Sequence, residues 1–500
     1  MSAHPKLPEH LNSYPLCERT RKFLARASFG HFIEGEIVPS SSGETLPVYD
    51  PSSGIEFARV ANGTAEDVEK AVKSARNAFD DGRWVNIPAM EKERRMRRLA
   101  QLFIDHKDIL TDLDVIDGGT TLLVSSFLVQ FGLDILEYYS GWPTKMHGTL
   151  PVSTPEVVVQ EVRTPIGVCA SITPWNGPSA APLAFVAPLA CGNSTVVKPA
   201  EQTPLTALLV AQLAIDAGIP PGVINVVQGR GHVVGEALVR HPLVDAISFT
   251  GSCDTGRRIM ANAAPRLKRI AMELGGKSPN IVFADANLEA AAAAASFAVW
   301  GHSGQVCTAG SRVLVQRKVH DELVARMIAV SKDLKVGPGF DADTVIGPLI
   351  SKEQLDKVHG YVKIGASEGA SVALGGDTCG NGGYFHQPTI FTGVRNNMRI
   401  AREEIFGPVM AVLPFDTEEE AYAIANDTDF GLAAGVWTND LSRAHRASQR
   451  LRVGTVWVNS YQLNLPNVPY GGIKQSGFGR NLGAASMDDY TQIKSVWLKL

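Results

Sequence analysis

The chain of 500 residues is too long for one hydrophobic core, and at roughly 150 residues per domain it predicts two to four structural units. Hydrophobic residues make up 45% of it and charged residues 20%, which is typical of a packed globular enzyme and excludes a disordered chain. The 47 basic and 51 acidic residues give a net charge of -4. This balance provides no general electrostatic reason to bind nucleic acid or an anionic membrane.

The cysteines are scattered along the chain and form no CxxC pair, so a disulfide framework and a metal site are both disfavoured. We expect no stretch that approaches the roughly 20 apolar residues needed to cross a bilayer. Arg19, Arg21, Lys22 and Arg26 faintly resemble a mitochondrial presequence, but the acidic residues and prolines nearby argue against it. We therefore expect a cytoplasmic protein without a membrane segment.

Helical and extended patterns alternate along the chain. The first clear element is a helix after Thr64, which begins a capping-box signature with Asp67. The elements expected next are a strand at 168–173, a strand at 194–197, a helix at 205–216, a strand at 223–227, a helix at 233–239 and a strand at 246–249. Strands that alternate with helices at this spacing predict a parallel sheet covered on both faces.

The second half of the chain has the same style. Asn287 is expected to cap an Ala-rich helix, and residues 311–316 return as a strand, which predicts a second α/β domain. Two further β-rich runs, 157–162 and 492–498, look like edge strands. Exposed edges promote aggregation unless they are covered, and pairing with another subunit is one solution. We therefore expect an oligomer.

Three residues have side chains that suit chemistry at a carbonyl group: Cys307, Glu273 and Asn176. Taken singly, each has a simpler interpretation, because a lone cysteine is most often a small buried hydrophobe and the other two fit loop positions. Together they match one task. A thiolate attacks a carbonyl carbon, an amide N–H stabilises the oxyanion, and a carboxylate activates water.

A hydride acceptor would also be needed, and the sequence holds a candidate site for one. Residues 248–252 read as a strand that runs into a turn at Gly251, followed by Ser252, Gly256 and a helix. Backbone N–H groups at such a helix start can hold a pyrophosphate, although the spacing is not G-x-G-x-x-G. After another strand, Lys198 and Glu201 add a cation and an acid suited to ribose hydroxyls.

These segments resemble the aldehyde dehydrogenase superfamily, of the hydrolytic and non-acylating type. The motifs occur in the family's order: Pro174-Trp175-Asn176, Lys198-Pro199-Ala200-Glu201, Phe249-Thr250-Gly251-Ser252 with Gly256, Glu273-Leu274-Gly275-Gly276-Lys277-Ser278, Gly304-Gln305-Val306-Cys307, Glu404-Ile405-Phe406-Gly407-Pro408-Val409, and Pro469-Tyr470-Gly471-Gly472-Ile473-Lys474 with Ser476-Gly477. The separation of Glu273 from Cys307, 307 - 273 = 34 residues, also matches the family. The resemblance runs from about residue 30 to the C-terminus.

The resemblance implies an α/β fold with two Rossmann-like domains and a small β flap for oligomerisation. It implies an NAD-binding domain at 1–141 and 161–272, a catalytic domain at 273–485, and oligomerisation strands at 142–160 and 486–500. It tilts the expected assembly to a homotetramer, a dimer of dimers, although a plain dimer stays open.

The resemblance also implies roles for single residues. Cys307 would be the nucleophile, Asn176 with the Cys307 backbone N–H the oxyanion hole, and Glu273 the base that hydrolyses the thioester. The implied cofactor is NAD, because an acid at position 201 would repel a 2′-phosphate. The implied cofactor-binding residues are Thr173, Trp175, Lys198, Glu201, Gly251, Ser252, Gly256, Glu404 and Phe406.

The sequence departs from the family around the expected substrate pocket, which would be formed by Gly177, Ala180, Ala181, Ala184, Asn464 and Tyr470. Gly177 and Asn464 stand where aromatic residues are common, which suggests a wide tunnel for a bulky hydrophobic, aromatic or terpenoid aldehyde. Neighbouring side chains that refill the space are the alternative. Phe185 replaces a common lysine and Asn481 a common glutamate on the proposed proton route, so ordered water would have to serve there.

Other interpretations stay open. A semialdehyde-specific or coenzyme A-acylating enzyme is one, although acylating members generally lack a base at the position of Glu273. A binding or structural protein that kept the fold and lost the activity is another. His302 suggests a Cys-His protease only weakly and is expected to be structural. The charged run 91–98 is expected to be the solvated face of an amphipathic helix rather than a nucleic-acid site.

Overall fold

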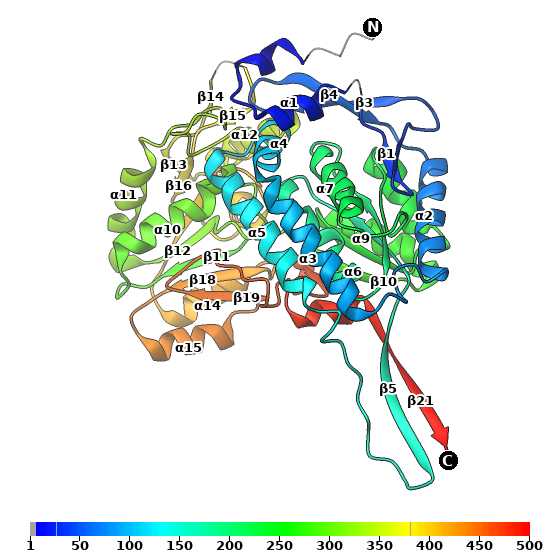
Figure 1. Cartoon of the computed structure of the whole chain (residues 1–500). Coiled ribbons are helices and arrows are strands. Elements are labelled where there is room, and N and C mark those ends of the chain that lie inside the picture. The colour runs from blue at the N-terminus through cyan, green and yellow to red at the C-terminus, as the bar shows by residue number, and fades with distance from the viewer. Residues whose placement is uncertain (1–6, 27, 381) are drawn as a thin grey trace.

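The computed structural model describes residues 7–26, 28–380 and 382–500, and two sheets form its two halves (Figure 1). The first sheet has eight strands, in the spatial order β2 Glu36–Val38, β1 His31–Ile33, β8 Ile224–Val226, β7 Ser194–Lys198, β6 Val168–Ile172, β9 Ala246–Thr250, β10 Arg269–Glu273 and β20 Gly477–Phe478. The inner strands from β8 to β10 are parallel. Antiparallel strands flank them: β1 followed by the edge strand β2 on one side, and the edge strand β20 on the other.

Helices cover both faces of the first sheet because its inner strands are apolar on both sides. Within β6, Val168 and Ala170 pack with the apolar residues of α2 Ala65–Asp80, α8 Glu236–Arg240 and α9 Cys253–Ala263. The intervening Cys169 points the other way, into a core that includes α7 Leu205–Asp216. The alternation along one strand therefore feeds two separate cores, as expected of a doubly wound sheet.

The second sheet has seven strands, in the order β13 Ser371–Leu374, β16 Thr389–Thr392, β17 Val409–Phe415, β12 Arg312–Gln316, β11 Pro279–Val282, β18 Ala433–Trp437 and β19 Thr455–Val458. All are parallel except β13. Its covering helices are α10 Leu288–Trp300, α11 His320–Ser331, α12 Lys352–Ser367, α13 Arg399–Arg402, α14 Glu418–Asn426 and α15 Leu441–Arg450. Leu314 and Val313 of β12 point to opposite cores.

The expected elements are present with small shifts at their ends. The helix at 205–216 is confirmed, and so is the capping box of Thr64 with Asp67. The expected cap at Asn287 is also present, because its side-chain oxygen accepts a hydrogen bond from the Ala290 N–H. The helix expected at 233–239 differs, because it begins with a π-helical turn at Gly231–Gly235 before α8. The other α-helices are α1 Glu18–Leu24, α3 Ala89–Asp105, α4 Lys107–Gly118, α5 Leu122–Ser140 and α6 Val186–Ala190. Two further strand pairs outside the large sheets are β3 Thr45–Asp50 with β4 Ile55–Ala61, and β14 Thr378–Cys379 with β15 Phe385–His386.

The two β-rich runs, far apart in the sequence, form one two-stranded antiparallel ribbon that projects from the body of the molecule (Figure 1). Strand β5 Val157–Pro165 pairs over its whole length with β21 Thr491–Lys499. Large apolar side chains of β21 and the chain end are exposed, with 63% of Ile493, 69% of Trp497 and 79% of Leu500 accessible. The ribbon thus carries apolar surface that the other described residues of this chain do not cover.

Helix α5 corrects the expectation that no stretch approaches a membrane span. Its 19 residues reach a mean hydropathy of 1.2, so by length and composition alone it passes that test. The helix packs against α3 and α4, and Val129, Leu133, Ile135 and Leu136 lie within the core of the first half. This packing buries one face of α5, while the side chains of Leu123 and Phe127 stay 48% and 59% exposed.

The junction between the two halves positions the site. Strand β10 ends the first half at Glu273, and β11 starts the second sheet at Pro279, so the linking loop spans only 274–278. Strand β20 returns to pair with Glu273 and Met272 of β10, although it falls within the range 273–485 expected for the catalytic domain. The domain boundaries themselves stay a prediction.

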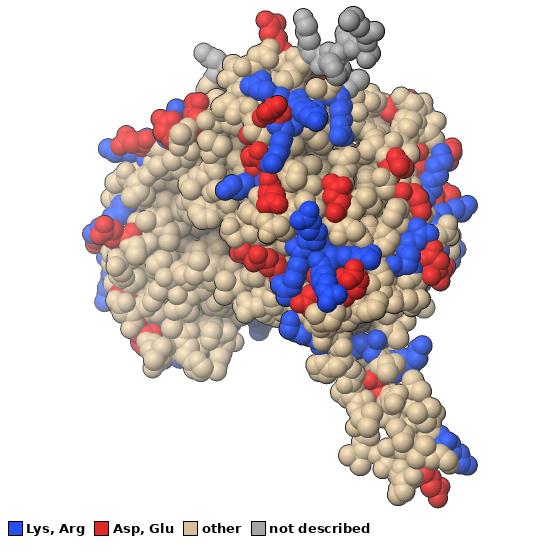
Figure 2. Space-filling view, in the orientation of Figure 1, with Lys and Arg blue, Asp and Glu red and all other residues tan. Residues whose placement is uncertain are grey.

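Charges are mixed on the face drawn in Figure 2, where the densest group of Lys and Arg side chains lies over α3. Arg95 pairs with Glu91 and Arg97 with Glu93 at distances of 2.9 and 2.8 Å. The apolar side of the same helix, including Met96, is fully buried. The run 91–98 is therefore the solvated face of an amphipathic helix, as expected.

Candidate active site

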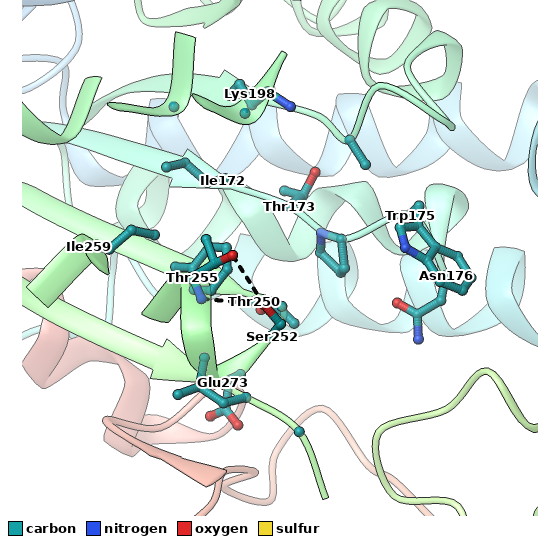
Figure 3. A pocket seen from close by; sticks show the side chains of 18 of the residues that line it. Ile172, Thr173, Trp175, Asn176, Lys198, Thr250, Ser252, Thr255, Ile259 and Glu273 are labelled. Atoms are coloured by element: carbon teal, nitrogen blue, oxygen red, sulfur yellow. Dashed lines mark hydrogen bonds between the residues drawn. The ribbon is translucent and has the colours of Figure 1, made fainter. Parts of the chain in front are cut away.

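A cavity of about 520 Å³ lies at the carboxyl ends of the parallel strands of the first sheet. Strands β6, β7, β9 and β10 end at Ile172, Lys198, Thr250 and Glu273, and these residues and those just beyond them line the cavity (Figure 3). Cys307 reaches the same cavity from the second half of the chain. Ligands of open α/β sheets bind at this edge, so the cavity is the candidate active site.

Most of the residues expected to bind a cofactor line this cavity: Thr173, Trp175, Lys198, Glu201, Gly251, Ser252, Glu404 and Phe406. Trp175 and Phe406 meet edge to face with their ring centroids 5.2 Å apart, which fixes one wall. Gly256 is the exception. It lies within α9, where an added Cβ would approach the Leu274 side chain to 2.9 Å, so its place is in helix packing rather than in the lining.

Lys198 and Glu201 form a polar end of the cavity. The ammonium of Lys198 donates a hydrogen bond to the Glu201 carboxylate at 2.9 Å, and the Lys198 side chain is almost completely buried. Burial acts to raise the pKa of Glu201, but the adjacent Lys198 charge and its hydrogen bond outweigh this and hold the pKa below its usual value. The pair therefore presents a charged carboxylate and a cation together.

A strained turn delivers Cys307 to the cavity. His302 and Ser303 have φ angles of 50° and 55°, in the left-handed region, directly after the end of α10. Burial lowers the pKa of His302 to about 4, so this histidine is a neutral, structural residue, as expected. Burial also raises the pKa of the Cys307 thiol to about 11, and the charges of Glu404 and Glu273 act in the same direction. Without a ligand, Cys307 therefore rests as a thiol.

Asn176 follows β6 and lies beside the cysteine turn. Its amide Nδ2 donates to the Gln305 carbonyl at 2.8 Å, two residues before Cys307 in the sequence. This hydrogen bond holds the side chain in place and leaves the second amide N–H for another acceptor. The structure thus joins a predicted oxyanion donor to the segment that carries the predicted nucleophile.

Glu273 is the most deeply buried carboxyl group among those that line the cavity. Its side chain is 5% exposed, and neither oxygen has a hydrogen-bond partner among the described residues. Burial raises its pKa well above the usual value, although the nearby Arg480 guanidinium acts in the opposite direction. Burial therefore favours the protonated form of Glu273, which forms part of the lining of the cavity that Cys307 enters.

The loop after Glu273 explains the two glycines of its motif. An added Cβ at Gly275 would lie 2.4 Å from a Glu404 carboxyl oxygen, and at Gly276 it would lie 2.4 Å from the Cys307 carbonyl oxygen. The Gly276 N–H instead donates to the Glu404 carboxyl group at 3.1 Å. The loop must therefore lack side chains at both positions to bring Glu404 and Cys307 together.

The residues expected to form a substrate pocket lie in different surroundings. An added Cβ at Gly177 would fit in ordinary van der Waals contact with Ala180 and Leu128, at 3.7 and 3.8 Å. Ala184 is buried in the core of the first half, and Asn464 is exposed on a surface loop. The side chain of Ala181 lies outside the described residues. Tyr470 contacts the site directly, because its hydroxyl lies 3.1 Å from Cys307 Sγ.

Sequence reasoning missed two residues of α12 that line the cavity, Gln354 and Lys357. The Gln354 amide donates to the Phe406 carbonyl at 2.7 Å and so supports a residue whose φ angle is 59°. Their spacing of three residues places them on one helix face, but nothing in the sequence indicates that this face meets Glu404. Within the described residues, no group of three or more His, Cys, Asp or Glu side chains is arranged to hold a metal ion.

A thiol, a buried carboxyl group and an amide gathered at the strand ends of two α/β halves define the class of enzymes that act on a carbonyl group. The family model described as the aldehyde dehydrogenase family matches residues 37–496. The chain belongs to the aldehyde dehydrogenase family.

Relatives from different organisms agree with this assignment. The chain is 43% identical to betaine aldehyde dehydrogenase of Bacillus subtilis, with 93% of this chain and 96% of that protein covered. It is 44% identical to a mitochondrial aldehyde dehydrogenase of Mesocricetus auratus, with 94% and 95% covered.

Solved structures show the same fold. The NAD+ complex of aldehyde dehydrogenase from Bacillus cereus matches with a TM-score of 0.96 at 40% identity, covering 97% of this chain and 99% of that one. A mutant of the indole-3-acetaldehyde dehydrogenase of P. syringae, in complex with NAD+ and IAA, matches with a TM-score of 0.93 at 43% identity, covering 95% and 97%. The expected family and the α/β fold with two Rossmann-like halves are confirmed.

Proposed function

We propose that this protein oxidises an aldehyde to the free carboxylate with NAD, through a thioester on Cys307. The observation that carries the proposal is the meeting of Cys307, Asn176 and Glu273 around one cavity, from segments far apart in the sequence. Each supplies a group that the reaction needs: a sulfur nucleophile, an amide donor and a carboxyl base.

The cavity fits NAD by the chemistry of its lining. Ser252 caps α9, whose first backbone N–H groups suit the pyrophosphate, and the pair of Lys198 with Glu201 suits the hydroxyls of the adenosine ribose. A charged Glu201 would repel the 2′-phosphate of NADP, which favours NAD. Glu404 and Phe406 are left for the nicotinamide ribose. When bound, NAD supplies the hydride acceptor, and two solved relatives were crystallised with NAD+.

The protein's own groups carry the rest of the reaction. After the thiol gives its proton to a water molecule, Cys307 Sγ bonds to the aldehyde carbon, the C=O π bond breaks and the charge passes to the carbonyl oxygen. The amide of Asn176 and the backbone N–H of Cys307 donate to that oxygen. Loss of hydride from the same carbon leaves a thioester on Cys307. Glu273, once ionised, takes a proton from water, the resulting hydroxide adds to the thioester carbon, and the C–S bond breaks to release the acid.

Glu273 also favours water over coenzyme A as the acyl acceptor. A carboxyl group held inside the cavity suits activation of a small water molecule, whereas a thiol acceptor brings its own nucleophile. The two positions where the family commonly has a lysine and a glutamate are here a buried Phe185 and Asn481. We therefore propose that the proton from Glu273 leaves through ordered water.

Removal of either reacting group tests the mechanism. We expect Cys307→Ala to form no NADH, and Glu273→Gln to give one turnover of NADH followed by a steady rate reduced at least 100-fold, because its thioester accumulates. In the wild type, kcat should fall as the pH drops, with an apparent pKa above the usual value of about 4.3, since only ionised Glu273 accepts a proton. Stopped-flow absorbance at 340 nm measures both effects. Full steady turnover of Glu273→Gln would contradict the assignment.

The substrate is proposed to be a bulky hydrophobic, aromatic or terpenoid aldehyde. The lack of a side chain at Gly177, directly after Asn176, supports this, as does the relative named for indole-3-acetaldehyde. The relative named for betaine aldehyde makes a compact cationic aldehyde the alternative.

A substrate panel with a matched variant decides this point. The wild type should show kcat/KM at least 30-fold higher, about 2 kcal/mol, for aromatic aldehydes than for acetaldehyde. Gly177→Phe should remove most of this preference by adding a large side chain next to Asn176. Gly360→Ala in α12, where an added Cβ has no neighbour within 4 Å, should leave the preference unchanged. Preference of the wild type for acetaldehyde or betaine aldehyde would refute the proposal.

The projecting ribbon of β5 and β21 is proposed to join subunits of a homotetramer, a dimer of dimers. The exposed apolar residues of β21 support this, because such a surface is costly to leave in water. The cytoplasmic location also remains a proposal, supported by the free state of all six cysteines.

Trp497→Lys tests the ribbon of β5 and β21 as an interface. A charge at this 69% exposed position should convert the assembly into smaller species, measured by light scattering after gel filtration. Lys499→Gln on the same strand is the control and should keep the wild-type mass. A wild type that runs as a monomer would contradict the proposal.

A further inference from the structure

The Tyr470 hydroxyl lies 3.1 Å from Cys307 Sγ, across 163 residues of sequence. Two backbone hydrogen bonds with Asn481, of 2.7 and 2.8 Å, hold the Tyr470 backbone in an antiparallel bridge. The ring itself packs against the core of the first half of the chain. The position of this hydroxyl is therefore fixed by elements outside the cysteine turn.

The groups around Cys307 mostly oppose formation of a thiolate. Burial and the charges of Glu404 and Glu273 raise the pKa of the thiol, as described above. Hydrogen bonds from the Tyr470 hydroxyl and the Thr308 backbone N–H act in the opposite direction. Tyr461 lies nearby, but its hydroxyl donates to the Thr308 carbonyl at 3.0 Å and not to the sulfur. Tyr470 thus supplies the side-chain hydrogen bond that favours the charged sulfur.

The direction of this hydrogen bond follows from the surroundings of Tyr470. Burial raises the pKa of its phenol well above the usual value, and nearby Cys307 and Glu273 add to the effect. The hydroxyl therefore keeps its proton over the working pH range. Since a thiolate has no proton to give, a protonated phenol that faces it acts as the donor.

We propose that Tyr470 is a catalytic residue, whose hydroxyl donates a hydrogen bond to the Cys307 thiolate, stabilises it and orients it for attack. This inference rests on the proposed function and assigns Tyr470 a task beyond lining a substrate pocket. No proton is transferred: the phenol keeps its hydrogen while the sulfur forms its bond to carbon, and the negative charge moves to the oxygen near Asn176.

The same short segment also contacts the base. An added Cβ at Gly471 would lie 2.6 Å from a Glu273 carboxyl oxygen, so the backbone next to Tyr470 forms the wall behind Glu273. The segment 470–471 thus meets the nucleophile through a side chain and the base through a bare backbone. A shift of this segment would disturb both groups together.

Alkylation of Cys307 tests the hydrogen bond without aldehyde or NAD. Iodoacetamide reacts with the thiolate, and the rate of modification of the Cys307 peptide can be followed by mass spectrometry across pH. We expect Tyr470→Phe to slow this reaction about tenfold at every pH below the thiol pKa, equivalent to an apparent pKa higher by about one unit. The kcat/KM of this variant should fall similarly near neutral pH and recover at high pH.

Tyr461→Phe is the matched control, because it removes a neighbouring phenol hydroxyl that does not reach the sulfur. Its alkylation profile should overlay that of the wild type. An unchanged profile for Tyr470→Phe, or an equal shift for Tyr461→Phe, would overturn the proposal. Since alkylation needs no turnover, this result is separate from a failure of the proposed function, which would appear as aldehyde oxidation by Cys307→Ala.

Discussion

The arrangement of the whole site depends on one short connection, the loop 274–278 between the last parallel strand of the first sheet and β11 of the second. Because the loop is so short, Glu273 must stand at the junction of the two halves. The same loop passes against Glu404 on one side and the Cys307 backbone on the other. Two glycines make these contacts sterically possible, so the groups proposed to bind the cofactor and to carry the chemistry are fixed relative to each other.

Burial is the physical effect that governs the resting state of this site. It raises the pKa of Cys307, Glu273 and Glu404 above their usual values, and so disfavours the charged form of each of these groups. A buried carboxyl group without a hydrogen-bond partner, such as Glu273 among the described residues, costs stability, and its presence here points to function. Around groups buried in this way a few donors, such as Asn176 and Tyr470, have a large effect on any charge that develops.

Local patterns in the sequence predicted the elements well, because caps and periodic apolar residues act over short distances. The helix 205–216, the caps at Thr64 and Asn287 and the paired runs at 157–162 and 492–498 are examples. The ordered motifs also singled out Cys307, Glu273 and Asn176, and all three line one cavity, while their roles stay a prediction.

Long-range packing was beyond the reach of those patterns. Gly256 follows a strand-turn motif but packs against Leu274, and Ala184 is small because it lies in a core. The contact of Tyr470 with Cys307 joins positions 163 residues apart, and only the three-dimensional structure reveals it. The contacts of α5 with α3 and α4 are likewise set by tertiary packing.

The most direct test of the account is the mass of the Cys307 peptide after Glu273→Gln is mixed with NAD and an aromatic aldehyde and quenched in acid. The account predicts that this peptide gains the mass of the acyl group, that the other cysteine peptides do not, and that hydroxylamine removes the adduct. An unmodified Cys307 peptide during rapid NADH formation, or an adduct on another cysteine, would contradict it.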